Sequence, residues 1–325
     1  MSAGRLLRVL IAAGLTGYLL WRSNPAAVFQ AAAHANLGWL AAAVLLVLFD
    51  RALMAERWIH LLCIIDPGAR PRLARLLKIF FVSTFVGTFL PASIGSDAVR
   101  AYSLSRENVS GADAIASVFM DRMLGVASLL MMGVAGLFLA QDLASNRIVL
   151  TSLAITMAVS VMTMLMIFSE RVGVWCARIA TAMPIPAVKR AAGGVIESVR
   201  RYVSHHVALL TVLASSLAVQ ILRVLQAYCL GRALGIEAGP AVYFAFIPLI
   251  LLVMLLPVSI NGLGTGQAAF VWFFARAGVE AAPAFALSLL FILALQLVGN
   301  LPGAFVYAFR PSPAMIRSGP GNVSR

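Results

Sequence analysis

The chain has 325 residues, of which 62% are hydrophobic and only 11% are charged. An ordinary soluble domain has roughly 25% charged residues, so this composition excludes a protein folded mainly in water. The net charge is +13, but the basic residues occur in short clusters between apolar segments, without the basic face of a nucleic-acid-binding domain. We interpret the clusters as cytoplasmic loops of a membrane protein, some of which also attract anionic lipid head groups.

Apolar segments long enough to enter a membrane recur along the whole chain. They cover residues 6–22, 37–62, 76–95, 112–140, 148–168, 207–231, 240–258, 267–278 and 284–308. The first has Arg5 and Arg8 before its apolar run from Val9 to Leu20 and resembles a signal peptide, but we expect it to be retained as a span because the remaining helices need no cleaved signal. Placing every basic cluster in the cytoplasm puts both termini there, in an inner (plasma) membrane.

Two of the apolar segments are interrupted by the same short pattern. Each contains Leu-Pro-x-Ser-Ile, at 90–94 and at 256–260, followed by one or more glycines. Proline removes a helical hydrogen bond and glycine permits a sharp change of backbone direction, so each segment is predicted to enter the membrane and return. The arms of these re-entrant hairpins are predicted at 76–90 and 97–106, and at 240–256 and 266–278.

The surroundings of the two breaks also correspond. A helix, a broken segment and a second helix span 37–140 in one unit and 207–308 in the other. The charge rule makes the two hairpins enter from opposite sides, which is typical of an inverted repeat; coincidence is the alternative. We therefore predict an all-α integral membrane protein with one polytopic domain, 1–325. It would have about six transmembrane helices, two re-entrant hairpins and an interfacial cytoplasmic linker at 169–206.

Ionisable residues inside the apolar segments carry the most information about function. Asp50 and Arg51 lie about 20 Å into one helix, and Asp121 and Arg122 lie about 14 Å into another, at 1.5 Å per residue. Arg223 lies inside a third apolar segment. A charge at the membrane centre costs roughly 2.5–3.5 kcal/mol on insertion scales, so these side chains should face a cavity or an opposite charge. Either they form ion pairs that only fix packing, or they line a polar pathway.

Asp121 and Arg122 cannot simply neutralise each other, because neighbouring residues of a helix point about 100° apart. Each is therefore expected to have a partner on another element. Glu56 and Arg57 lie nearer the cytoplasmic end of their segment, and we expect both at the membrane interface.

The two predicted hairpin tips supply further polar groups. Ser96 is expected to cap a returning half-helix whose free N–H groups favour anions, although Asp97 would already offset the helix dipole. Arg100, one turn later, can bind phosphate through its forked guanidinium. The glycine-rich second tip, capped by Thr265, could hold a phosphate, and a bare flexible turn is the alternative.

No Ser/His/Asp, Cys/His or metal-binding spacing is recognisable, so we predict no catalytic residue, no metal and no cofactor, and we do not expect an enzyme. The candidate substrate-binding residues are Ser96, Asp97, Arg100, Asp121, Arg122, Arg223, Asn261, Gly262, Gly264, Thr265 and Gln267.

Three motifs, taken together and in order, resemble the lysylphosphatidylglycerol synthase transmembrane family over about residues 8–310. They are the run from Leu90 to Tyr102, the run from Asp121 to Gly125, and the turn from Pro257 to Gly264. The family includes the flippase-type module of bacterial multiple peptide resistance factors and stand-alone proteins near hopanoid or cell-envelope lipid genes. The resemblance implies a role in moving or handling lipids. It places Asp97, Arg100, Asp121 and Arg122 at the polar positions of the family.

The chain departs from the family pattern in two respects. Members usually carry Arg-Glu after the second glycine-rich turn, where this chain has Gly266-Gln267. The soluble aminoacyl-transferase domain of the bifunctional members has no counterpart in the about 16 residues after the last apolar segment, so lysyl transfer is not expected.

These observations predict a flippase-like transporter of an anionic, polyprenyl or hopanoid-type envelope lipid. Arg100, Arg122 and Arg223 would attract the head group between the hairpin tips, while Asp97 or Asp121 could carry a coupling proton. One alternative is a membrane transferase with a lipid-linked donor, although the short loops lack the acidic pair that such enzymes usually need. The other is a scaffold that does not transport and binds lipid-synthesis enzymes. The expected partners are membrane lipids with anionic head groups and, on the scaffold interpretation, those enzymes, with no nucleic acid.

Overall fold

The computed structural model describes residues 33–65, 71–89, 94–106, 109–139, 186–255 and 264–308, and the single positions 26, 30, 151, 154 and 158. Its regular elements are α3 (Leu37–Ile65), α4 (Leu73–Phe89), α5 (Ile94–Ser105), α6 (Gly111–Leu139), α10 (Pro186–Val203), α11 (His206–Ala233), α12 (Pro240–Leu255), α13 (Thr265–Phe274), the 3-10 turn η1 (Ala275–Ala277) and α14 (Ala281–Ala308).

The predicted all-α membrane architecture is confirmed in these segments. Within the described ranges, α3, α6 and α11 are long and apolar enough to cross a membrane. The total number of spans stays a prediction. The predicted span 6–22 lies outside the described residues, as do all but three positions of the span 148–168 and the linker 169–206 up to residue 185.

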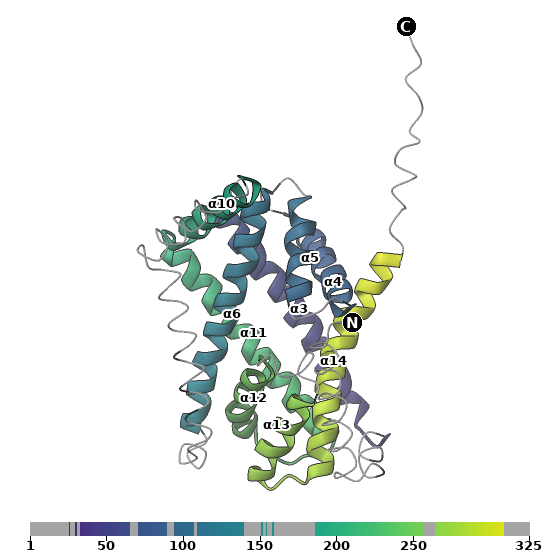
Figure 1. Cartoon of the computed structure of the whole chain (residues 1–325). Helices are drawn as coiled ribbons and strands as arrows, with labels where there is room; N and C mark the ends of the chain where they lie inside the picture. Colours follow the sequence, from purple (N-terminus) through teal and green to yellow (C-terminus); the bar gives the residue numbers. More distant parts are fainter. Residues whose placement is uncertain are drawn as a thin grey trace, which may run out of the picture.

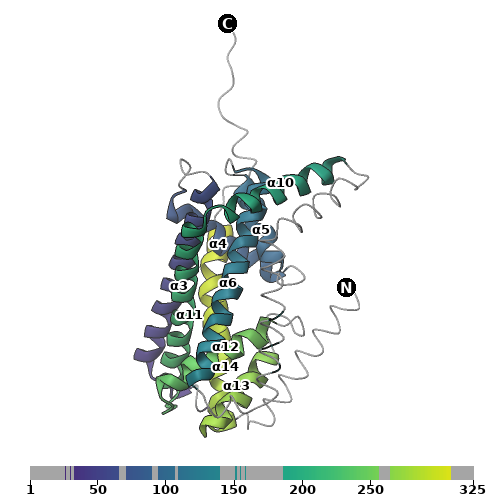
Figure 2. The ribbon, with the colours of Figure 1, turned by 90° about the vertical axis from the view of Figure 1, so that its left-hand side faces the viewer.

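The bundle is organised around α3 and α11, which pack side by side along their length (Figure 2). On either side of this pair, α4 packs on α14 and α6 packs on α12. Each predicted repeat unit therefore packs its broken segment on the last helix of the other unit. A two-fold relation between the units requires this exchange, so it supports the inverted repeat, which stays a prediction.

The interrupted segments form two helix pairs in opposite halves of the molecule. The α4–α5 pair lies in the half next to α10, and the α12–α13 pair lies in the other half (Figure 1). Helix α10, the second half of the predicted linker, lies across one end of the bundle in both ribbon views. The breaks themselves, at 90–93 and 256–263, lie outside the described residues.

Both predicted helix caps were wrong. Helix α5 begins at Ile94, so Ser96 lies inside its first turn and not at the cap position. Asp97 lies in the same turn, where its negative charge interacts favourably with the free N–H groups of the helix start. In α13 the cap position belongs to Gly264 and not to Thr265. Gly264 has φ 85°, a conformation that glycine adopts without strain, and its N–H donates to the side-chain oxygen of Gln267.

The core consists of two large hydrophobic clusters, one in each half of the bundle. The first is formed mainly by α11 to α14 and contains interlocked aromatic rings, among them Tyr243 and Phe274 at 5.2 Å between centroids. The second is formed mainly by α3 to α6 and includes Trp58. Tyr202 fixes α10 to this second cluster, because its side chain is fully buried there.

We predict that Gly303→Ala destabilises the α14–α4 contact. A Cβ added at Gly303 would lie 2.8 Å from Phe85 Cβ and from the carbonyl carbon of Phe81, which is rigid backbone. Such overpacking typically costs about 1–3 kcal/mol. The measurement is the midpoint of thermal unfolding in detergent, with Gly193→Ala on α10 as the control, because a Cβ there meets nothing within 4 Å. Equal midpoints for the two variants would contradict the prediction.

Candidate functional site

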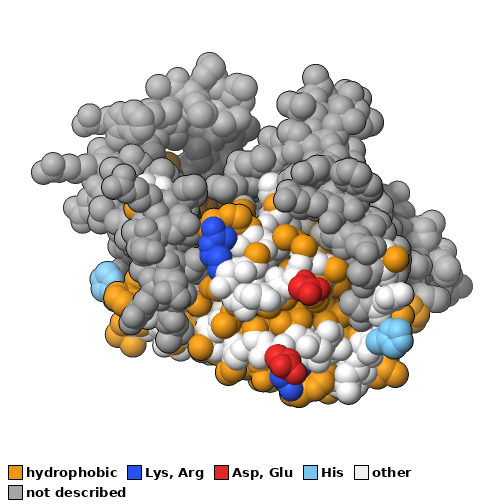
Figure 3. Space-filling view, turned by 90° about the horizontal axis from the view of Figure 1, so that it is seen from below, with side chains coloured by type: hydrophobic (Ala, Val, Ile, Leu, Met, Phe, Trp, Pro, Cys, Tyr) orange, Lys and Arg blue, Asp and Glu red, His pale blue; other side chains and the backbone are white. Residues whose placement is uncertain are grey.

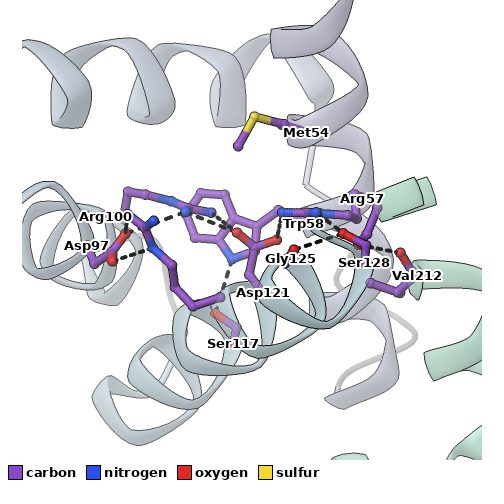
Figure 4. Close-up of polar contacts among 12 residues, drawn as sticks. Met54, Arg57, Trp58, Asp97, Arg100, Ser117, Asp121, Gly125, Ser128 and Val212 are labelled. Atoms are coloured by element: carbon purple, nitrogen blue, oxygen red, sulfur yellow. Dashed lines mark hydrogen bonds and ion pairs between the residues drawn. The ribbon is translucent and has the colours of Figure 1, made fainter. Parts of the chain in front are cut away.

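A buried carboxylate, Asp121 in α6, is the centre of a charged network in the second cluster (Figure 4). It is 2% exposed and contacts arginines from two other helices. Arg57 of α3 places Nη2 2.6 Å from Oδ1, and Arg100 of α5 donates to Oδ2 from both Nη atoms, at 3.1 and 3.2 Å. Asp121 therefore joins α3, α5 and α6 at one point.

Arg57 is buried, which corrects the expectation that it lies at the membrane interface. Its side chain is 4% exposed and also donates to Ser216 Oγ of α11 at 2.9 Å. The residue turns inward because Asp121 and Ser216 offer it acceptors where α3 packs between α6 and α11. A sequence signal existed, since Arg57 follows Asp50 by seven residues and so lies on the same helix face.

Arg100 is held by aromatic rings as well as by charge. Its guanidinium carbon lies 4.3 Å from the ring centre of Trp58 and 4.6 Å from that of Phe80, which are cation–π distances. Trp58 is fixed in turn, because its Nε1 donates to Ser117 Oγ at 3.2 Å. Arg100 is therefore a fixed part of the wall, with little freedom to follow a ligand.

Asp97 and Arg122 form a second, more accessible ion pair beside this centre. Arg122 Nε and Nη2 donate to the two oxygens of Asp97 at 2.6 and 3.1 Å. The side chain of Arg122 is 46% exposed and that of Asp97 is 17% exposed. Asp121 and Arg122 thus each have partners on other elements, as predicted. Because it is the most exposed charge of the network, Arg122 is the best placed to change partner.

A further group of charges comes from the middle of α3 and α11. Asp50 is fully buried, with Arg223 Nε at 3.5 Å and Arg51 Nε at 3.8 Å from its oxygens. These are ion pairs without hydrogen bonds, and neither carboxylate oxygen has a hydrogen-bond partner among the described residues. Arg51 and Arg223 also donate to Met54 Sδ, at 3.7 and 3.6 Å respectively, and a thioether is only a weak acceptor. Their donors are therefore poorly satisfied.

The two groups of charges surround one cavity of about 250 Å³. Its wall combines polar groups with apolar side chains such as Val126, Leu129 and Leu255, the last at the end of α12. The arginines that line it are Arg51, Arg57, Arg100, Arg122 and Arg223. Three aspartates oppose these five arginines, Asp97 and Asp121 in the wall and Asp50 behind it, which leaves two positive charges in excess among the described residues. Such a cavity is suited to an anion.

The structure brings together the predicted residues of the first hairpin and the long helices. Those that line the cavity are Ser96, Asp97, Arg100, Asp121, Arg122 and Arg223. Gly264, Thr265 and Gln267 are not part of its lining; the buried Gln267 side chain serves to cap α13. Asn261 and Gly262 lie outside the described residues. Sequence reasoning omitted Arg51, Arg57 and Gln220 from the candidate list.

Gln220 joins α11 to α6 at the edge of the cavity. Its Nε2 donates to the Gly125 carbonyl and to Ser128 Oγ, both at 3.3 Å. Gln220 and Arg223 are three residues apart, so they lie on one face of α11. Two polar residues on one face of an otherwise apolar helix were the sequence signal for a polar cavity on that side.

Comparison with known proteins agrees with the resemblance noted in the sequence. No curated protein matches the chain. The family described as the lysylphosphatidylglycerol synthase TM region matches residues 5–303, which contain every residue of the charged network. The chain therefore belongs to the lysylphosphatidylglycerol synthase transmembrane-region family.

Proposed function

We propose that this protein moves an anionic lipid between membrane leaflets and that the charged cavity holds the head group during the passage. Membership of the family indicates a membrane protein that handles lipids. We propose in addition that the protein transports the lipid, and that the lipid is an anionic, polyprenyl or hopanoid-type one. The supporting observation is the excess of arginine over aspartate around a cavity inside the apolar bundle.

The charge balance favours a phosphate-containing ligand over a cation or a neutral lipid. Unpaired positive charge inside a membrane protein is costly, and an anionic head group entering the cavity would compensate it. Guanidinium groups suit this role because they bind phosphate through two parallel hydrogen bonds. The apolar side of the wall fits the hydrocarbon next to the head group.

The arginines divide into fixed and available ones. Arg57 and Arg100 are committed to Asp121, which keeps the wall in shape. Arg122, Arg51 and Arg223 are held more weakly or are more exposed, so their donors can turn to a phosphate. When the substrate enters, we propose that its head group replaces Asp97 as the partner of the Arg122 guanidinium.

The proposal assigns no covalent chemistry to the protein. Each of the three aspartates lies within 3.8 Å of an arginine nitrogen, and these positive charges oppose the binding of a metal ion to the carboxylates. A transferase with a metal-dependent lipid-linked donor therefore fits the cavity poorly.

The distribution of charge supports the proposed orientation in an inner (plasma) membrane, with both termini in the cytoplasm. Exposed basic side chains gather at the α10 end, among them Arg72, Lys78 and Arg200. At the opposite end, the described surface shows hydrophobic side chains between uncharged polar groups and backbone, with few charged side chains (Figure 3). Lys and Arg accumulate in cytoplasmic loops, so we place the α10 end in the cytoplasm.

We predict that Asp50→Asn strengthens the binding of an anionic head group. The substitution removes a negative charge that lies behind Arg51 and Arg223, and it keeps the shape of the side chain. Two charges about 4 Å apart interact by about 1 kcal/mol even at the dielectric constant of water and by more in a less polar cavity, so we expect at least about fivefold higher affinity. Native mass spectrometry with phosphatidylglycerol measures it. Weaker binding by a folded Asp50→Asn variant would oppose the proposal.

The test of the proposed function is translocation in proteoliposomes. Fluorescent phosphatidylglycerol and phosphatidylcholine analogues are followed separately, and the accessible label is bleached by dithionite. We expect the protein to accelerate movement of phosphatidylglycerol over empty liposomes, and to move phosphatidylcholine less. No acceleration of either lipid would refute transport, and equal acceleration of both would refute the role assigned to the arginines.

A further inference from the structure

A second basic cavity lies at the start of α4, apart from the charged cavity inside the bundle. It measures about 450 Å³ and is lined by Arg72, Arg75 and Lys78 on the α4 side and by Ser103 of α5. The three basic side chains are exposed, and no acidic residue is part of the described lining. We call it the α4 groove.

The helix itself makes this concentration of positive charge unfavourable. Arg72 precedes α4, and its carbonyl accepts the N–H of Arg75 at 2.9 Å, so these two cations lie at the positive end of the helix dipole, with Lys78 one turn further along. The first turn contains no acidic residue. Cations at this end destabilise a helix, whereas an anion there would be favoured both by the dipole and by the side chains.

The apolar part of the groove indicates what kind of anion fits. Ile79 and Val82 continue the stripe of Arg72 and Arg75 along one face of α4, and they are 7% and 4% exposed. The groove is therefore charged at its mouth and apolar toward the bundle interior. A free phosphate would use only the charged part, whereas a phospholipid would use both.

The surroundings place the groove near the membrane surface. It lies in the half of the molecule next to α10 (Figure 1), which we assign to the cytoplasm. Tyr102, the neighbour of Ser103, is 65% exposed, and exposed tyrosines are enriched at the boundary between membrane and water. Basic pockets between helices at the cytoplasmic surface typically bind anionic phospholipid head groups.

We propose that the α4 groove is a separate binding site for an anionic phospholipid, with the phosphate held by Arg72, Arg75 and Lys78. The site does not depend on transport. A lipid held there lies at the edge of the hairpin whose other face, through Phe80 and Thr84, lines the charged cavity. A lipid in the groove would therefore support the position of α4 beside that cavity.

The test is the retention of phosphatidylglycerol by the purified full chain, measured by native mass spectrometry after release from nanodiscs that contain phosphatidylglycerol and phosphatidylcholine. The variant is Arg72→Gln with Lys78→Gln. A basic side chain near an anionic surface contributes about a fivefold factor, so we expect about 30-fold weaker retention at the groove. The matched control is Arg200→Gln with Arg232→Gln, which removes two exposed positive charges from α10 and α11.

Retention equal to that of wild type in the groove variant, or an equal loss in the control, would overturn the proposal. Displacement of the lipid by inorganic phosphate alone would assign the groove to free phosphate and also overturn it. The groove variant keeps every residue of the charged cavity, so its translocation of phosphatidylglycerol in proteoliposomes is measured beside its retention. Failure of the groove is therefore distinguishable from failure of the proposed transport.

Discussion

Replacement of Asp121 by alanine is expected to lower the free energy of unfolding by about 3–5 kcal/mol, the largest stability effect that we predict. The carboxylate is 2% exposed and pairs with two buried arginines, Arg57 and Arg100. Its removal leaves both guanidinium groups without their counter-charge in the apolar bundle. The change in the midpoint of thermal or denaturant unfolding, measured in the same detergent for both proteins, gives the effect.

The control for this prediction is Asp113→Ala at the α10 end of the bundle. Asp113 also pairs with an arginine, Arg201, but the two side chains are 16% and 46% exposed. Partly exposed pairs contribute about 1 kcal/mol or less, so this variant should unfold close to wild type. A double variant that adds Arg57→Met to Asp121→Ala should recover part of the lost stability, because it also removes one of the two buried charges that Asp121→Ala leaves without a partner. Equal losses for Asp121→Ala and Asp113→Ala would show that the buried network is not what holds these helices.

Replacement of Arg122 by alanine is expected to slow the movement of an anionic lipid by at least about tenfold without unfolding the protein. Arg122 is 46% exposed, so the bundle loses little packing, but the cavity loses its most available guanidinium. Hydrogen bonds to charged groups contribute about 1.5–3 kcal/mol, which corresponds to a factor between about 10 and 150. The rate of phosphatidylglycerol translocation in proteoliposomes measures the change.

Two further variants distinguish the binding of phosphate by Arg122 from the general effect of a positive charge. Arg122→Lys keeps the charge but loses the fork, so it should retain part of the activity. Arg201→Ala removes an arginine of the same exposure, also paired with one aspartate, at the α10 end of the bundle. We expect it to translocate lipid like wild type. If Arg201→Ala slows transport as much as Arg122→Ala, the cavity has no special role.

The positions of the helices could be predicted because a membrane-crossing helix needs a long run of apolar residues, which is visible in the sequence. Proline inside such a run removes a helical hydrogen bond, so Pro91 and Pro257 predicted where two of the runs are interrupted. The predicted range 207–231 became His206–Ala233 in the structure, and 112–140 became Gly111–Leu139. That Asp50 and Asp121 are buried also followed from the sequence, since each lies deep in an apolar helix.

The partners of these charges could not be read from the sequence. Asp121 meets Arg57 and Arg100, which lie 64 and 21 positions earlier on other helices, and the choice depends on how those helices pack. Arg57 shows the difficulty, because its position near the helix end suggested the interface, while its acceptors lie in the interior. The role of Gln267 was missed for a different reason: its side-chain oxygen accepts the N–H of Gly264, so it caps its own helix and does not face a ligand site.

Photo-crosslinking tests most directly whether an anionic head group enters the charged cavity. Phosphatidylglycerol with a photoreactive group at its head is incorporated in nanodiscs with the full chain, and the labelled peptides are sequenced. We predict labels in α6 around residues 119–129 and in α11 around residues 219–226, both lost in an Arg122→Ala, Arg223→Ala double variant that is still folded. Labels confined to the outer surface of the protein, with none in these two stretches, would contradict the account.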